Sequence, residues 1–106
     1  VGVWKSTDAG ISWNLTGPLG PVGRVEIAIS PVNTSRIFAS AEAAAFGSGS
    51  VLLMSNNSGD SWSAVNVTIN ENTVDFLNEQ GWYDNTIACD PLNANIVYFG
   101  GVDLFR

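Results

Sequence analysis

The sequence contains no histidine, one cysteine and only four lysine and arginine residues among 106. Histidine is the commonest transition-metal ligand, and Cys89 alone cannot form an internal disulfide. We therefore predict no metal site and no cofactor. The net charge is −6, and a surface this poor in cations cannot neutralise a row of phosphates. Nucleic acid and anionic membrane surfaces are thus poor candidates as partners.

Long apolar runs are also absent. No stretch of about 18 apolar residues, the length needed to cross a bilayer as a helix, occurs in the sequence. Charged residues make up only 13% of the chain, and the composition is rich in Asn, Ser, Thr and Gly. This composition is typical of extracellular β proteins, so we predict a secreted or cell-surface location.

One eight-residue pattern occurs twice, at Ser6–Trp13 and at Ser55–Trp62, 49 residues apart. Both copies read S-x-(D/N)-x-G-x-S-W and follow a short apolar run, which predicts a hairpin turn between two strands. Glycine supplies the positive φ of such a turn, and the short polar side chains can bind its amides. The residues to which we assign this structural role are Ser6, Asp8, Gly10, Trp13, Ser55, Asn57, Gly59 and Trp62.

This pattern resembles the Asp-box (BNR) repeat of sialidases, sortilin-like receptors and xyloglucanase-like glycosidases. The resemblance implies an all-β fold, a β-propeller of four-stranded antiparallel blades in which the box is structural. Asn57 replaces Asp8 in the second copy, and an amide cannot act as an acid or base at neutral pH. That replacement also argues against a catalytic role for the box.

A second repeat, offset by 60 residues, aligns Ile27–Asn33 with Ile87–Asn93. Its alternation of apolar and polar residues predicts strands, and about 50 residues with four strands match a propeller blade. We expect residues 1–106 to be part of one propeller and a piece of a longer protein. Residues 1–16 would end one blade, 24–68 form a complete blade, and 84–106 start a third. The expected strands are 2–6, 11–16, 24–30, 36–42, 50–55, 61–68, 84–90, 96–100 and 101–106, with no helix.

Each copy of the 60-residue repeat contains a turn with proline. Proline presets φ for a turn. The side chain before it, Ser30 in one copy and Asp90 in the other, is predicted to cap the amides of the turn.

Two connections are longer than their counterparts, at 43–50 and at 67–84. In an antiparallel blade, alternate connections emerge on the same side of the sheet. Both long connections are therefore predicted to lie on one face, with the boxes on the opposite face. In the families named above, the face with such insertions carries the ligand site.

The longer connection ends in Glu79, Gln80, Trp82, Tyr83 and Asp84. Aromatic rings can stack on sugar faces and carboxylates can bind hydroxyl groups, so these five residues are our candidates for ligand binding. The alternative is structural, with Trp82 and Tyr83 covering the end of a strand and Asp84 capping it. This segment also resembles large bacterial proteins with Asp boxes that are exported by the type IX secretion route.

We favour a non-catalytic binding or scaffold propeller that recognises a glycan or a protein. The alternative is part of a glycoside hydrolase, whose two carboxylates face each other across a cleft. In that case this chain would supply only one of the two carboxylates, either Asp84, a weak candidate, or Asp75. The arginine cluster that a sialidase needs to bind the carboxylate of its substrate is absent from this sequence. A sortilin-like peptide receptor is the third possibility, weakened by the shortage of cysteine.

Overall fold

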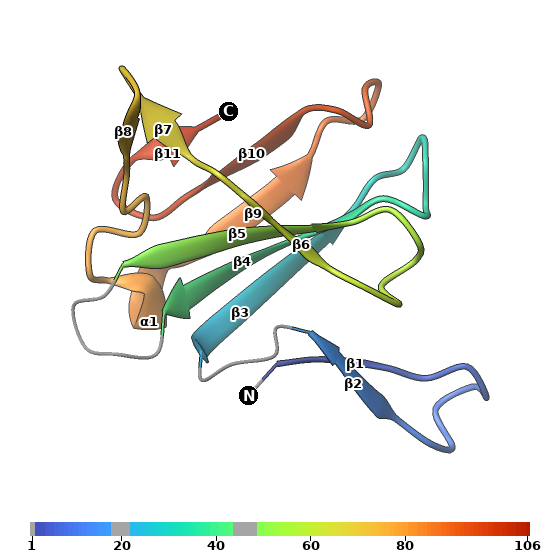
Figure 1. Cartoon of the computed structure of the whole chain (residues 1–106). Helices are drawn as coiled ribbons and strands as arrows, with labels where there is room; N and C mark the ends of the chain where they lie inside the picture. The colour runs from blue at the N-terminus through green and yellow to red at the C-terminus, as the bar shows by residue number, and fades with distance from the viewer. Residues whose placement is uncertain (1, 18–21, 44–48) are drawn as a thin grey trace.

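The computed structural model describes residues 2–17, 22–43 and 49–106. Strands occupy 47% of these residues and helix only 4%. The strands form three main sheets that follow one another in chain order and fan out from one another (Figure 1). The predicted all-β class is therefore confirmed.

All strand pairs are antiparallel, and each pair joins strands that are consecutive in the sequence. The first sheet contains β1 (Val3–Lys5) and β2 (Asn14–Gly17). The second contains β3 (Val22–Ile29), β4 (Ile37–Ala43), β5 (Ser50–Ser55) and β6 (Ser63–Val65). A small hairpin follows, β7 (Thr68–Ile69) with β8 (Asn72–Thr73). The third sheet contains β9 (Thr86–Cys89), β10 (Val97–Gly100) and β11 (Leu104–Phe105).

The strand registers repeat from sheet to sheet. Trp4 pairs with Leu15 in the first sheet as Leu53 pairs with Ala64 in the second, both 49 residues later. Leu53 also pairs with Ala39 on its other side, and Phe105 pairs with Phe99 in the same way, 60 residues after Ala39. Trp4, Leu53 and Phe105 therefore occupy equivalent positions in the three sheets.

Several strands are shorter than expected because turns take up their ends. The strand expected at 11–16 begins at Asn14, since the amide of Ser12 donates to the Asp8 side chain instead of to a neighbouring strand. The strand expected at 61–68 ends at Val65, and the chain then forms the β7–β8 hairpin. The strand expected at 84–90 begins at Thr86.

The prediction of no helix is wrong at one place, where Gly81–Asp84 form the single turn α1. The amides of Tyr83 and Asp84 both donate to the Gln80 carbonyl, at 2.8 and 3.1 Å. Glycine is required at the start of α1, because a Cβ at Gly81 would lie 2.8 Å from Leu77 Cδ1 and 2.9 Å from Glu42 Cβ. Four residues give no periodic pattern from which a helix could be predicted.

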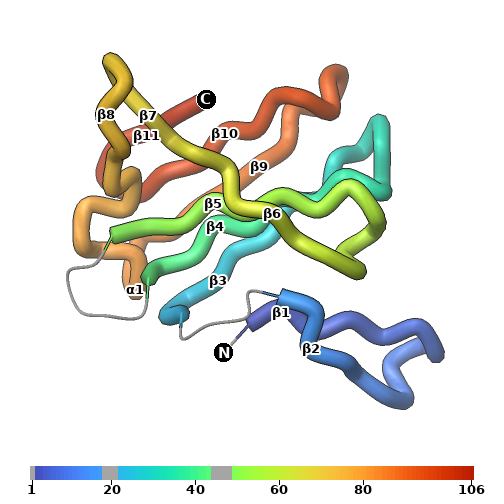
Figure 2. The backbone as a smooth tube through the Cα atoms, in the orientation of Figure 1, coloured from blue at the N-terminus to red at the C-terminus, as the bar shows by residue number. Residues whose placement is uncertain are grey.

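The hydrophobic core lies between the second and third sheets. Its buried members are Phe38, Leu52, Phe76, Leu77, Val97 and Phe99. The rings of Phe76 and Phe99 meet edge to face, with centroids 4.8 Å apart. Phe76 and Leu77 belong to the long 67–84 connection, which is thus anchored in the core. The tube view shows this connection running alongside both sheets before it enters β9 (Figure 2).

The two proline turns differ in how they are capped. Asp90 Oδ1 accepts from the amides of Leu92 and Asn93 at 2.8 and 2.9 Å, as predicted. Its Oδ2 accepts from the Tyr98 hydroxyl at 3.0 Å. The prediction for Ser30 is wrong, because its Oγ is buried without a hydrogen-bond partner among the described residues. The position equivalent to Tyr98 is Phe38, which has no hydroxyl group to offer.

The turns and the long connections lie at opposite ends of the sheets. Both S-x-(D/N)-x-G-x-S-W turns and both proline turns lie at one end, and α1 lies at the other (Figure 1). The two long connections meet there, because the amide of Phe76 donates to Ser50 Oγ at 2.8 Å. Residues 44–48 of the connection predicted at 43–50 are outside the described residues.

Candidate functional site

The Ser6–Trp13 turn, called turn 1 here, is closed by its own side chains. Asp8 Oδ1 accepts from the Ser12 amide at 2.9 Å and from Ser6 Oγ at 2.8 Å, and Asp8 Oδ2 accepts from Ser12 Oγ at 2.6 Å. These bonds, chiefly that from the Ser12 side chain, lower the pKa of Asp8 from 3.8 to about 2. Both oxygens are used inside the turn, so Asp8 is unsuited to proton transfer.

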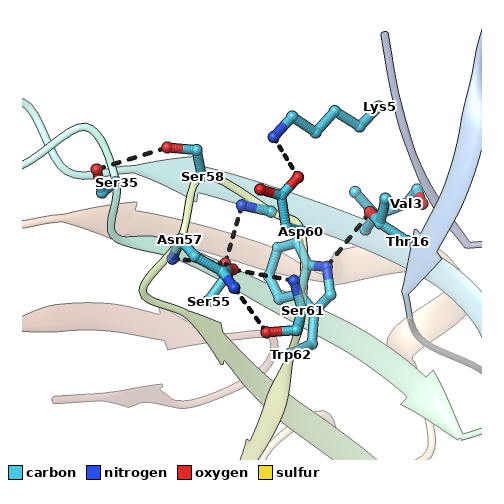
Figure 3. Close-up of polar contacts among 11 residues, drawn as sticks. Val3, Lys5, Thr16, Ser35, Ser55, Asn57, Ser58, Asp60, Ser61 and Trp62 are labelled. Atoms are coloured by element: carbon cyan, nitrogen blue, oxygen red, sulfur yellow. Dashed lines mark hydrogen bonds and ion pairs between the residues drawn. The ribbon is translucent and has the colours of Figure 1, made fainter. Parts of the chain in front are cut away.

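The Ser55–Trp62 turn, called turn 2, has the same geometry with an amide in place of the acid (Figure 3). Asn57 Oδ1 accepts from the Ser61 amide and from Ser55 Oγ, both at 2.9 Å. Asn57 Nδ2 donates to Ser61 Oγ at 2.8 Å. The Ser61 hydroxyl accepts here, whereas the Ser12 hydroxyl donates, so the bond between the third and seventh residues of the turn runs in opposite directions in the two copies.

The tryptophans that end the two turns have different surroundings. Trp62 packs against the first sheet, where a Cβ at Gly17 would collide with its indole ring. Its Nε1 donates to Thr16 Oγ1 at 3.5 Å. Trp13 is 57% exposed, and its Nε1 donates to the Gly10 carbonyl of its own turn at 3.1 Å. Trp62 is therefore packed against a neighbouring sheet, whereas Trp13 is exposed.

Trp82 and Tyr83 form an exposed aromatic pair on α1. Their side chains are 66% and 67% exposed, and their ring centroids are 5.5 Å apart at an interplanar angle of 48°. The structural alternative, in which these rings cover the end of a strand and hold the connection in place, does not fit this exposure. Phe76 and Leu77 are the side chains that are buried from this connection.

The turn that precedes the aromatic pair is held by hydrogen bonds. Asp75 closes the turn before α1, with its carboxylate accepting from the amides of Leu77 and Glu79 at 3.2 and 3.0 Å. This role uses both oxygens of Asp75, which removes it as a candidate carboxylate for hydrolysis. Glu79 and Gln80 are exposed, and neither side chain makes a hydrogen bond or ion pair among the described residues.

Two residues that the sequence analysis missed tie α1 to the second sheet. Arg24 Nη1 donates to the Tyr83 carbonyl at 3.0 Å, while its Nε donates to Glu26 Oε1 at 2.8 Å. Asn85 is buried directly after α1, and its Nδ2 donates to the Ser40 carbonyl at 2.9 Å. Its Oδ1 accepts from Ser40 Oγ at 2.6 Å.

Asp84 lies at the end of α1 and is half-buried. Its Oδ1 is buried without a hydrogen-bond partner among the described residues, next to the backbone of Gly101. It does not cap the strand, so this part of the structural alternative is also unsupported. Glu42 is a second carboxylate at this end, beneath Gly81. Its position at the end of β4, beside the long connection, was the signal that could have identified it.

The described part of the chain contains no group of three or more metal-ligating side chains. Cys89 packs against the core, and burial raises the pKa of its thiol, which lowers the fraction of reactive thiolate. Among the described residues, no helix is long and apolar enough to cross a membrane.

A solved structure similar to this chain is that of the GH74 enzyme of Niastella koreensis. The sequences are 28% identical and the TM-score is 0.62. The match covers 96% of this chain but only 17% of the enzyme, so this chain spans about a sixth of its length. The match agrees with the three antiparallel sheets, and the chain is a fragment of a β-propeller. No protein-family model and no curated protein matches the sequence.

Proposed function

We propose that this chain forms part of a larger β-propeller that binds a glycan at the end carrying α1. The observation that carries the proposal is the exposed pair Trp82 and Tyr83. Two large apolar rings at 66% and 67% exposure are unfavourable in water unless they serve a partner. Sugar rings present flat C–H faces that stack on aromatic side chains, and Tyr and Trp lose little conformational entropy when they are fixed.

The support beneath these rings favours binding rather than chance exposure. Arg24 and Asn85 hold the C-terminal end of α1 to the second sheet, so the rings are in place before a ligand arrives. Preorganisation of this kind lowers the entropy cost of binding. Asp84, beside the rings, would accept hydrogen bonds from sugar hydroxyl groups. The similarity to a GH74 enzyme favours a carbohydrate over a peptide as the ligand.

Turns 1 and 2 serve structure in this proposal, as Asp boxes that close strand pairs. The side chains of Asp8 and Asn57 make hydrogen bonds within their own turns. We further propose that the protein acts outside the cell, where polysaccharides are accessible. The composition, poor in charge and rich in Asn, Ser and Thr, supports this location.

A glycoside hydrolase is the second candidate function. It is favoured by the GH74 match and by the position of Asp84 on α1, which also carries the exposed rings. Asp84 would then supply one of two carboxylates, and the other would come from another part of the propeller.

One set of variants separates the two functions. Binding of the wild-type protein to a glycan array, and to soluble xyloglucan as a probe, is compared with that of Trp82→Ala, Asp84→Asn and the control Leu92→Ala. Leu92 is 87% exposed and belongs to the turn between β9 and β10, which lies at the opposite end of the sheets from α1 (Figure 1). A binding module loses affinity in Trp82→Ala and shows no hydrolysis in any form. Hydrolysis by the wild type that disappears in Asp84→Asn, with binding retained, would establish the enzyme instead.

A further inference from the structure

The charge of the chain is concentrated at the end that carries α1. Every charged side chain of the sequence lies within the described residues. Six of the ten acids and one of the four cations, Arg24, are found at this end, which gives it a charge of −5 out of the net −6. The six acids are Glu26, Glu42, Asp75, Glu79, Asp84 and Asp103.

Contacts with α1 and its neighbours place these acids. Glu42 packs beneath the first residue of α1, and Asp84 is the last residue of α1. Asp75 and Glu79 belong to the turn that precedes α1. Asp103 belongs to the loop between β10 and β11, which lies against the Asp84 side chain. Glu79 and Asp103 are exposed, so their carboxylates face the solvent around α1.

The guanidinium group of Arg24 is already occupied. Its Nε and Nη2 atoms both lie against Glu26 Oε1, at 2.8 and 2.7 Å, and its Nη1 donates to the Tyr83 carbonyl at 3.0 Å. All three nitrogens are therefore used, and Glu26 neutralises the charge. A uronic acid or a sulfated sugar at α1 would meet carboxylates with no free cation to pair with, and like charges brought together oppose binding.

The opposite end of the sheets has a balanced charge. Lys5 forms an ion pair there with Asp60 at 2.5 Å (Figure 3). The remaining acid, Glu71, lies on the β7–β8 hairpin. The concentration of negative charge is thus a feature of the α1 end and does not follow from the acidic composition alone. The charged residues at the opposite end are Lys5, Arg36 and Arg106 with Asp8, Asp60 and Asp90.

The exposed rings favour the same sign of ligand charge as the acids. The face of an aromatic ring is electron-rich and attracts a cation that lies within about 6 Å of its centroid, most strongly in Trp. Trp82 and Tyr83 are 66% and 67% exposed, so their faces are accessible to a ligand. A sugar with a protonated amino group offers both a C–H face for stacking and a cation for the rings and carboxylates.

We propose that the glycan bound at Trp82 and Tyr83 carries free amino groups, as in oligosaccharides of glucosamine. The rings stack on the sugar units, and the carboxylates around α1, with Glu79 and Asp103 the exposed ones, attract the ammonium groups. This inference rests on the proposed function and names the class of ligand. N-acetylation keeps the sugar ring and removes the positive charge, so the acetylated form of the same oligosaccharide is the matched control ligand.

The test is calorimetric titration of the protein with a glucosamine hexasaccharide and with its N-acetylated form. At about pH 5.5 the carboxylates are ionised, and the sugar amines are protonated. In dilute buffer the amino form is expected to bind at least about tenfold more tightly. The difference should shrink in about 1 M NaCl, where the Debye length falls to about 3 Å.

The failure of this inference is distinguishable from the failure of the proposed function. A protein that binds the acetylated form equally well, or that binds only neutral or acidic glycans, would overturn the inference and leave glycan binding at the rings in place. A protein that binds no glycan of any class would overturn both.

Variants then assign the preference to the acids around α1. The double variant Glu79→Gln, Asp103→Asn should weaken binding of the amino form at least about threefold and leave binding of the acetylated form unchanged. Glu71→Gln removes an exposed charge from the hairpin whose tip points away from α1 (Figure 1) and should leave the affinities for both ligands unchanged. An undiminished preference for the amino form in the double variant would contradict the proposal.

The aromatic variant shows whether the amino form binds at the rings. Trp82→Ala is expected to weaken binding of both hexasaccharides alike, because both stack on the same ring. Unchanged affinity for the amino form in the folded Trp82→Ala variant would mean that the amino form is held elsewhere by general attraction to an acidic protein, and it would contradict the proposal.

Discussion

The indole ring of Trp62 covers Gly17 of the neighbouring sheet so closely that no side chain fits between them. This contact joins the first sheet to the second, and it depends on the absence of a Cβ at residue 17. Sheets of two strands are marginal by themselves, so the first sheet relies on this interface for its stability.

Gly17→Ala is therefore expected to destabilise the protein by about 1–3 kcal/mol, the usual cost of overpacking. Thr16→Val keeps the volume and removes only a hydrogen bond to Trp62, so its effect should stay near or below about 1 kcal/mol. Urea unfolding at one fixed protein concentration measures both. Equal stability of Gly17→Ala and the wild type would show that the two sheets are not packed in this way.

The two turns should respond differently to acid. Asp8 has a pKa of about 2, lowered from 3.8, so its contribution to stability is present above the ordinary carboxylate pKa and is lost as the pH falls through about 2. Asn57 does not titrate, so turn 2 should show no such loss. Asp8→Asn is expected to fold like the wild type and to flatten the fall in melting temperature below about pH 4. Asn57→Asp should steepen that fall, and identical acid profiles for all three proteins would contradict the assignment.

The buried amide of Asn85 should be costly to remove. Asn85→Ala removes both hydrogen bonds to Ser40 and leaves its buried hydroxyl without a partner, for which about 1–3 kcal/mol of destabilisation is expected. Asn72→Ala, at an exposed hairpin residue, should change stability by less than about 0.5 kcal/mol. Denaturant unfolding distinguishes them, and similar values for both would mean that Asn85 does not bridge the sheets.

The Tyr98 hydroxyl reports on the second proline turn. Its hydrogen bond to Asp90 raises the pKa of Tyr98, and the bonds that Asp90 accepts, first from the Leu92 amide, lower the pKa of that carboxyl. Asp90→Ser introduces the serine that the first copy has at position 30, removes the carboxylate that binds Tyr98 and should bring the Tyr98 pKa back toward its ordinary value. The phenolate absorbance of Tyr98, measured against pH and against a Tyr83→Phe background, gives the shift. No change in Asp90→Ser would contradict this hydrogen bond.

Sequence repeats predicted the strands of the three main sheets and their order, but neither the β7–β8 hairpin nor α1. The period of two in β3 and the 49- and 60-residue offsets reflect local chain geometry and repeated packing, both of which leave a trace in the sequence. The equivalence of Trp4, Leu53 and Phe105 follows from these offsets and is confirmed by strand pairing.

The contacts that hold the candidate binding site on α1 could not be predicted from the sequence. The support beneath Trp82 and Tyr83 depends on Arg24, Ser40 and Asn85, which lie up to 61 residues apart along the chain. Single polar residues at such separations leave no periodic signal. Similarly, Trp13 and Trp62 have the same local sequence, and only their neighbours in space make one exposed and the other packed.

The central claim is that the rings on α1 bind a glycan, and the most direct test is calorimetric titration of the protein with the glycan that binds best on the array. The account predicts that Trp82→Ala and Tyr83→Ala each weaken binding about tenfold, since an aromatic contact contributes about 1 kcal/mol or more. Leu92→Ala should bind as the wild type does. Undiminished affinity in the folded Trp82→Ala, Tyr83→Ala double variant would contradict the claim.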